Sequence, residues 1–468
     1  MKVAVVGSGV SGLAATWLLN EYSDHEVHLY EADCRPGGHA NTVTFSQSGR
    51  EPVEVDTYIV FNPSTYPNFL RFLNLYPDLR QHICATDMTF SVSRDGGAFE
   101  WAGNNLSSVF CQPKRLLDPD MWRMLYDIPM TAAIWSTPPD KCTLDFPART
   151  LIQFMHNHHL LQIFGKPSWL TLRGGSLERG CIITSVPALD GHGDHNVELV
   201  TALGERIHYD RIIVAAHSDA ALSILRAGGG ATADEERILG EFEWNKNVAV
   251  LHCDKRLMPK RRVAWSCWNY LTRSTVDKSG NAKANVDQVS LPRAYQNLPF
   301  TDWMNELQHI SEETYGPVLV TLNPPFDPDP ETLGGRYEYD HPVLGMKAVR
   351  AQQELSTIQN KRGISFVGAW TKYGFHEDGF TSGLRAASVI MHESSTGATK
   401  GMTCEMRMPF EILDADHTVR HETQLAALLF DVFEGTGLRL IVGTCLSLCL
   451  GVFGCLVNAV GACLAKPA

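Results

Sequence analysis

The feature that most constrains the fold is the glycine-rich run Gly7-Ser8-Gly9-Val10-Ser11-Gly12 near the N-terminus. The apolar, β-branched segment Lys2–Val6 precedes it and predicts a buried strand. After the run, Leu13–Leu19 predicts a helix and Glu26–Tyr30 predicts a second strand. A strand, a glycine turn, a helix and a second strand within so short a segment indicate one right-handed βαβ unit.

The spacing of the glycines indicates what this unit binds. In the G-x-G-x-x-G pattern, Gly7 allows the tight turn, Gly9 lets the backbone approach a pyrophosphate, and Gly12 lets the helix pack on the strand. The N-terminus of the helix offers N–H donors to the phosphates. Glu31 lies at the end of the second strand, where a carboxylate accepts hydrogen bonds from a ribose. The pattern therefore predicts a dinucleotide site.

Two further glycine-rich segments indicate the type of dinucleotide. Arg35-Pro36-Gly37-Gly38 comes just after Glu31, and it resembles the R-x-G-G extension of flavoproteins in the amine oxidase and phytoene desaturase superfamily. Far along the chain, a strand predicted at Ile364–Val367 leads to a glycine turn through Gly379 and a helix over Thr381–His392. That second segment resembles the part of the superfamily that closes over the flavin ring.

Shorter segments resemble one branch of this superfamily, a group of predicted FAD-binding, amine-oxidase-like proteins. They are Tyr30-Glu31-Ala32, Gly37–Thr42, Ile59–Asn62, Thr65–Phe69, Phe90–Ser93, Phe99–Gly103, Trp169, Gly174–Ser176, Ala216–Asp219, Trp268–Tyr270, Val320–Pro324 and His376–Gly379. The resemblance covers roughly residues 1–395. It implies an α/β fold in which a Rossmann-like FAD-binding domain is interleaved with an α+β substrate domain.

The resemblance also implies a division of the chain and a set of cofactor contacts. The expected FAD-binding domain takes 1–60, 177–230 and 362–395, the substrate domain 61–176 and 231–361, a linker or helical tail 396–437, and an anchor 438–464. By position, the expected FAD contacts are Gly7, Gly9, Gly12, Glu31, Arg35, Gly38, Val186, Gly368, Asp378 and Gly379.

Two departures from the superfamily pattern bear on activity. Tyr58 stands where the superfamily usually has a glycine, and a tyrosine there could crowd the flavin or deflect the loop. After Ser176, the chain leads almost at once into the strand-like run Cys181-Ile182-Ile183, without the helix that the superfamily usually has at that place.

Flavin chemistry needs no Ser/His/Asp triad, because the cofactor itself accepts the hydride. His376 and Glu377 lie in the predicted flavin-closing turn, as candidate catalytic proton carriers or flavin hydrogen-bond partners. Trp265, Trp268 and Tyr270 could line a substrate site or fill the core. No metal site is predicted, since the histidines around His156 have no carboxylate or cysteine beside them.

The overall charge makes nucleic acid an unexpected partner. The net charge is -12, and an acidic body repels phosphate backbones. The twelve cysteines show neither zinc spacing nor a disulfide framework, which favours a reducing compartment.

The segment Ile441–Leu464 contains no charged residue. As a helix it would be about 36 Å long, enough to cross a hydrocarbon core of about 30 Å. It therefore predicts a C-terminal transmembrane helix, with the catalytic body in the cytosol. Four glycines in this segment leave a homodimer open.

These observations together predict an FAD-dependent oxidoreductase of amine oxidase type. It would remove a hydride from a lipid acyl chain, since a membrane-tethered enzyme meets lipids by diffusion in two dimensions. Two alternatives stay open: a flavin amine oxidase acting on a soluble amine, and a catalytically inactive scaffold with the flavoprotein fold.

Overall fold

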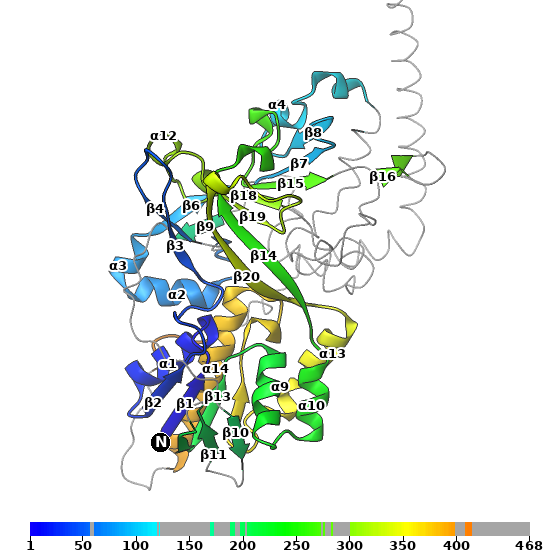
Figure 1. Cartoon of the computed structure of the whole chain (residues 1–468). Coiled ribbons are helices and arrows are strands. Elements are labelled where there is room, and N and C mark those ends of the chain that lie inside the picture. Colours follow the sequence, from blue (N-terminus) through cyan, green and yellow to red (C-terminus); the bar gives the residue numbers. More distant parts are fainter. Residues whose placement is uncertain are drawn as a thin grey trace, which may run out of the picture.

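The computed structural model describes residues 1–56, 60–118, 121, 169–172, 188–191, 197–201, 204–272, 275–276, 282–283, 300–397 and 408–413. These residues form two halves, joined by two long paired strands that run from one half into the other (Figure 1). One half holds a parallel sheet with helices, and we call it the nucleotide half after the expected dinucleotide site. The other holds a larger mixed sheet, and we call it the substrate half after the expected substrate domain. The two long strands are β14 (Glu243–His252) and β20 (Leu333–Val343).

The nucleotide half is built on a four-stranded parallel sheet in the order β2-β1-β13-β21. Its strands are β1 (Lys2–Val6), β2 (Glu26–Tyr30), β13 (Arg211–Val214) and β21 (Ile364–Phe366). β1, β13 and β21 are mostly apolar and buried, as strands of a sheet covered on both faces must be, whereas the edge strand β2 is only partly buried. The strands predicted from the sequence at Lys2–Val6, Glu26–Tyr30 and Ile364–Val367 are confirmed. The exact boundaries of the domains stay a prediction.

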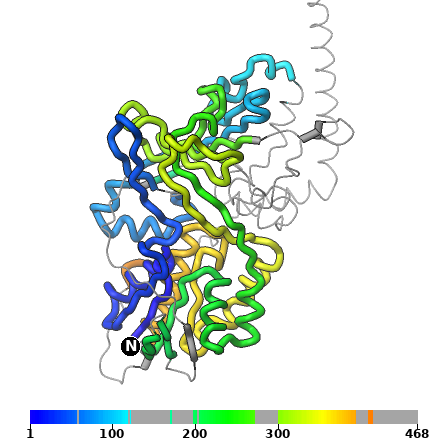
Figure 2. Tube along the Cα trace, viewed as in Figure 1, coloured from blue at the N-terminus to red at the C-terminus, as the bar shows by residue number. Residues whose placement is uncertain are grey.

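Helices cover both faces of this sheet. On one face, α1 (Val10–Tyr22) packs beside α14 (His376–Gly397), so the first and last described helices lie side by side (Figure 2). On the other face, α9 (Ser218–Ala227), α10 (Ala233–Gly240) and α13 (Met346–Glu354) bury a second apolar core.

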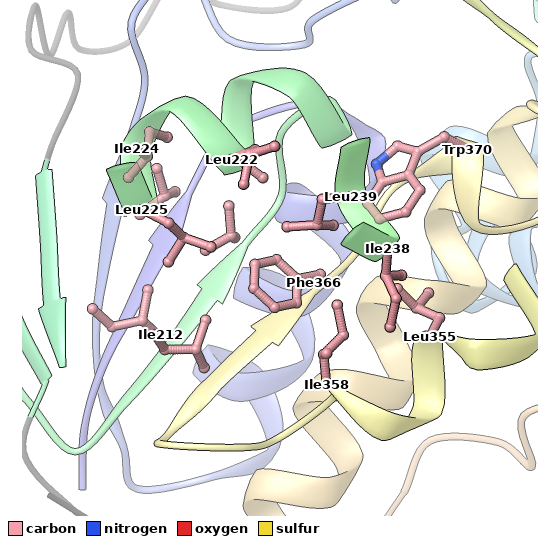
Figure 3. Close-up of a cluster of buried hydrophobic side chains, with 14 of the residues drawn as sticks. Ile212, Leu222, Ile224, Leu225, Ile238, Leu239, Leu355, Ile358, Phe366 and Trp370 are labelled. Carbon is pink, nitrogen blue, oxygen red and sulfur yellow. The ribbon is translucent and has the colours of Figure 1, made fainter. Parts of the chain in front are cut away.

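Figure 3 shows that second core, in which Leu222 and Leu239 from the helices meet Ile212 and Phe366 from the strands. The ring of Trp370, which is almost fully buried, closes one end of the core. Its indole Nε1 donates a hydrogen bond to the carbonyl of Ala216 at 3.0 Å. That bond ties the loop after β21 to the loop after β13, so the core fixes the position of both loops.

The substrate half is organised around a seven-stranded sheet in the order β20-β14-β19-β18-β15-β7-β8. Its shorter strands are β7 (Phe90–Arg94), β8 (Phe99–Ala102), β15 (Trp268–Thr272), β18 (Phe300–Trp303) and β19 (Leu319–Leu322). Neighbouring strands pair antiparallel except β15 and β7, which are parallel. Segments from both parts of the expected substrate domain thus meet in one sheet.

Smaller elements complete the described chain. The remaining strands are β3 (Thr42–Phe45), β4 (Val53–Asp56), β5 (Val60–Phe61), β6 (Ile83–Thr86), β9 (Trp169–Leu172), β10 (Ala188–Gly191), β11 (Val197–Val200), β12 (Arg206–Tyr209), β16 (Thr275–Val276) and β17 (Ala282–Lys283). The remaining α-helices are α2 (Pro67–Leu75), α3 (Pro77–Arg80), α4 (Leu106–Val109), α11 (Met304–Leu307) and α12 (Glu312–Tyr315).

The structure corrects one part of the predicted fold, the C-terminal transmembrane helix. The part of the chain that the structure describes contains no helix long and apolar enough to cross a membrane. Its longest helix, α14, carries charged residues along its length and buries one face against α1. The segment 438–464 lies outside the described residues. The described residues therefore form a Rossmann-like α/β fold, in which a membrane-spanning helix is not supported. The homodimer suggested by the glycines of that segment is not supported either. Placement of the body in the cytosol stays a prediction.

Candidate functional site

A cavity of about 500 Å³ joins the two halves. At one end it meets the carboxyl ends of all four parallel strands, at Gly7, Glu31, Ala215 and Gly368. At the other end it reaches the face of the seven-stranded sheet that carries Trp268. Ligands of open α/β sheets bind at the carboxyl ends of the strands, so the first end is the expected nucleotide end.

Gly7 and Gly12 are required by close packing, as the sequence predicts. Gly7 has φ +107, and an added Cβ would lie 2.3 Å from the carbonyl oxygen of Ala215. A Cβ on Gly12 would lie 1.8 Å from the carbonyl oxygen of Gly7. Neither position tolerates a side chain, because in both cases the obstructing atom belongs to the backbone.

Gly9 differs from these two glycines, because nothing lies within 4 Å of a Cβ built there. It is the N-cap of α1 and lines the cavity together with Val10 and Ser11. No side chain caps this helix end, and its first turn holds no acidic residue. The uncapped N–H groups and the positive end of the helix dipole therefore face an open space that fits a diphosphate.

Glu31 lines the same end of the cavity and is held firmly. Its Oε2 accepts hydrogen bonds from the backbone N–H of Ser8 at 2.7 Å and from the Ser8 hydroxyl at 2.5 Å. Its Oε1 accepts from the N–H groups of Ala32 and Asp33. The carboxylate thus locks the end of β2 to the glycine loop, in the place predicted for a ribose partner.

The guanidinium of Arg35 holds its own loop, and the predicted contact of Arg35 with FAD stays a prediction. It donates to the carbonyl oxygens of Gly38 at 2.7 Å and Ala40 at 3.1 Å. Gly38 lines the cavity with φ +58, whereas Arg35 does not line it. The geometry favours Arg35 as a support for the Gly38 backbone, rather than as a direct phosphate partner.

The segment predicted as a turn at His376–Gly379 is in fact the first turn of α14. Asp378 explains this early start, since its Oδ2 accepts hydrogen bonds from the N–H groups of Tyr373 and Phe375 and caps the helix. Burial raises the pKa of Asp378 to about 7. Gly379 lets α14 approach α1, because a Cβ there would lie 2.7 Å from Cγ1 of Val10.

The two predicted catalytic residues point in different directions. His376 lines the cavity, and burial lowers the pKa of its imidazole, which favours the neutral ring. Glu377 does not line the cavity. Its carboxylate accepts hydrogen bonds from the N–H groups of Asn68 and Phe69 at 3.0 and 2.9 Å. Glu377 thereby caps the N-terminus of α2, and burial raises its pKa to about 6.

Three histidines that were not proposed as site residues also line the cavity, beside His376: His39, His217 and His341. The ring of His39 lies 5.2 Å from that of His217 and 5.6 Å from that of His341, measured between centroids. Burial lowers the pKa of each of these three, that of His341 to about 4, so neutral rings are favoured. A signal existed for two of them: His39 follows the Gly-Gly pair, and His217 follows a strand of the parallel sheet.

The substrate end of the cavity is an apolar chamber. Its walls include Met88, Phe90, Trp169, Trp268, Phe300, Met304 and Leu307. Of the three aromatic residues considered from the sequence, only Trp268 lines it. Trp265 packs instead under Arg262, with its Nε1 bonded to the Pro259 carbonyl. One acidic residue of the chamber, Asp302, was not foreseen.

Two of the sequence expectations lie outside the described residues: Val186, the proposed adenine contact, and Tyr58. The same holds for the short segment after Ser176 and for the histidines around His156. Among the described residues, no group of three histidine, cysteine, aspartate or glutamate residues could hold a metal ion.

Comparison with known proteins supports this description. Residues 5–75 match the family model of an NAD(P)-binding Rossmann-like domain. Among curated proteins, no sequence matches the chain.

Several solved structures share the fold. A putative protoporphyrinogen oxidase from Exiguobacterium sp. 255-15 has 12% identity and a TM-score of 0.50, over 84% of this chain and 99% of that one. A fatty acid isomerase from P. acnes has 11% identity and a TM-score of 0.50, over 83% and 98%. Putrescine oxidase bound to putrescine has 12% identity and a TM-score of 0.50, over 84% and 99%.

At 11–12% identity these structures show the fold that the chain shares with them. The predicted resemblance is confirmed at the level of the fold: the chain carries a Rossmann-like dinucleotide domain within the fold of flavin amine oxidase-like and protoporphyrinogen oxidase-like enzymes.

Proposed function

We propose that this chain is an FAD-dependent oxidoreductase that removes a hydride from an apolar substrate. The observation that supports this most is the continuity of the cavity. A single space connects a glycine loop with an uncapped helix end to a chamber walled by aromatic side chains. A cofactor held at the first end would extend its reactive part toward the second.

The residues at the nucleotide end fit FAD. The open space at Gly9 and the N–H groups that begin α1 would hold the diphosphate, and Glu31 would hold the ribose. Gly368 and the start of α14 line the cavity farther along. Bound FAD supplies the hydride acceptor, so the protein itself needs no nucleophile.

The chain's own residues position the substrate and control water and protons. The aromatic walls of the chamber exclude water and give an apolar substrate a large contact surface. His376 presents a neutral imidazole that can hold or release one proton at a ring nitrogen. Glu377 is proposed to act through structure, since it fixes α2 against the start of α14.

Two substrate classes fit the chamber, and different observations favour each. The apolar walls support a lipid acyl chain as the group from which hydride is removed. The carboxyl of Asp302, whose Oδ1 has no hydrogen-bond partner in the described part of the chain, supports an amine. The solved structures with this fold include both a fatty acid isomerase and a putrescine oxidase, and at this level of identity they favour neither class.

Anaerobic reduction of the bound flavin tests the proposal and ranks the two classes. The full chain, loaded with FAD, is mixed with unsaturated or methylated acyl chains and, separately, with monoamines and polyamines. A true substrate bleaches the flavin absorbance, and the colour returns when oxygen is admitted. A chain that binds FAD but is reduced by neither class would contradict the proposed oxidoreductase and favour an inactive scaffold.

A further inference from the structure

Asp302 occupies a position that its neighbours make apolar. It lies on β18, directly opposite Trp268 of β15 on one side and Val320 of β19 on the other. Opposite residues of paired strands share a face of the sheet, and Trp268 in turn stacks on Phe90 of β7 with 5.3 Å between ring centroids. Phe90, Trp268 and Asp302 all line the chamber, so a single carboxyl interrupts an apolar row.

The carboxyl of Asp302 is buried without a partner among the described residues. The residue is 2% exposed, and its Oδ1 has no hydrogen bond. Such a group is costly to bury, and burial raises the pKa of Asp302 well above its usual range. A side chain that only filled space at this position would be expected to be apolar.

Glu100 is a buried carboxylate of the same sheet that has hydrogen-bond partners. It is 1% exposed, on β8. Its oxygens accept hydrogen bonds from the Ser93 hydroxyl, from the backbone N–H of Lys260 and from the guanidinium of Arg261. Glu100 is not among the residues that line the cavity. The carboxylate away from the cavity is satisfied, whereas the one facing the cavity is not.

The charges of the residues that line the cavity limit the class of ligand that can bind there. No lysine or arginine lines the cavity among the described residues, whereas Glu31, Asp302 and Asp340 do. Gln308, another polar residue of the chamber, is already bonded to the backbone of Asp56 through both its oxygen and its nitrogen. A ligand that carries a carboxylate would meet no positive partner there. A protonated amine would meet the carboxyl of Asp302 and the faces of aromatic rings, which attract cations.

We propose that Asp302 is a specificity-determining residue that binds the protonated amino group of an apolar amine in the chamber. This inference rests on the proposed function, because it takes the chamber as the substrate site. The amino group donates hydrogen bonds to the Asp302 carboxylate, and its hydrocarbon part packs on Phe90 and Trp268. The amine is thereby preferred over an alcohol or a carboxylate of equal length.

Calorimetric titration of the full chain with octylamine, octanol and octanoate tests this assignment without requiring turnover. The wild-type chain is expected to bind octylamine most tightly. Asp302→Asn, which keeps the shape of the side chain, should weaken octylamine binding about 10–100-fold, the range of a charge-assisted hydrogen bond. Octanol binding should change less than about 3-fold. Glu100→Gln is the matched control, because it removes a buried carboxylate of the same sheet away from the cavity and should leave octylamine affinity unchanged.

Other results overturn the assignment. They are equal octylamine affinity in the wild type and Asp302→Asn, tightest binding of octanoate, or no octylamine binding to the wild-type chain. Asp302→Leu gives a second check, because it should fold at least as well as the wild type and still lose octylamine. If octylamine binds through Asp302 but never reduces bound flavin, the assignment of Asp302 is retained and the proposed oxidation fails. The two failures are therefore distinguishable.

Discussion

The two ends of the cavity hold their polar groups in opposite ways. At the nucleotide end, Glu31 and the Gly38 backbone are fixed by hydrogen bonds within one stretch of chain. At the substrate end, the Oδ1 of Asp302 has no hydrogen-bond partner among the described residues, although the residue lies between two paired strands. The contrast teaches that this protein preorganises its cofactor site through the backbone, and reserves one side chain of the chamber for a ligand.

The largest effect is expected from a pair of glycines in the nucleotide half. Gly12→Ala places a Cβ 1.8 Å from a backbone oxygen, so we expect at least about 3 kcal/mol loss in the free energy of unfolding, together with loss of FAD. Gly9→Ala meets open space at φ -66, so the fold should be retained while FAD affinity falls. Denaturant unfolding gives the free energy of unfolding of both variants, and titration with FAD gives their affinity for the cofactor. If both variants were equally destabilised, the distinction between a packing glycine and a cofactor glycine would be wrong.

A second, smaller effect compares the two buried carboxyls of the substrate half. Glu100→Leu leaves several buried donors unsatisfied and should lower the free energy of unfolding by about 3 kcal/mol. Asp302→Leu removes an unpartnered group, and should raise that free energy by about 1 kcal/mol near neutral pH. Urea unfolding of both variants checks the signs. A destabilised Asp302→Leu would indicate a structural partner for this carboxyl.

The increase in the free energy of unfolding that we expect from Asp302→Leu should also depend on pH. Because burial raises the pKa of Asp302 in the folded state, the folded chain holds a proton that the unfolded chain releases above about pH 4. The contribution of Asp302 to the free energy of unfolding of the wild type therefore falls as the pH rises from that value, and Asp302→Leu has no such contribution to lose. The difference between the two should widen from pH 4 to pH 7, and a constant difference would contradict the raised pKa.

An effect smaller than that of Glu100→Leu is expected from Glu377, which joins the start of α14 to α2. Glu377→Ala removes the cap of α2 and should cost about 1–2 kcal/mol of stability. If Glu377 were instead a catalytic base with its pKa near 6, Glu377→Gln would remove an inflection near pH 6 from the rate profile. We expect the inflections of the rate profile to be the same in Glu377→Gln and in the wild type.

The sequence was informative wherever the signal is local. The glycine spacing and the strands Lys2–Val6 and Ile364–Val367 depend on nearby residues only, and the structure contains these strands with ends that differ by at most one residue. The start of α14 was misplaced, because the capping contacts of Asp378 run back to Tyr373 and Phe375 and cannot be seen in a glycine pattern.

The chamber could not be predicted, because its residues come from strands that pair across long stretches of chain. Asp302 follows Phe300 in strict alternation, so the pattern itself gives no sign that both face a cavity. His341 has no motif around it either. The hydrogen bonds of Arg35 could not be predicted for a different reason, since a charge near a predicted phosphate site can equally bind carbonyl groups of its own loop.

The central claim, that the cavity holds FAD, is tested most directly by the visible spectrum of the purified full chain before and after dithionite. We predict a yellow protein that bleaches on reduction and releases FAD when denatured, with the colour weakened in Gly9→Ala. A folded but colourless wild-type chain that cannot be loaded with added FAD would contradict the account.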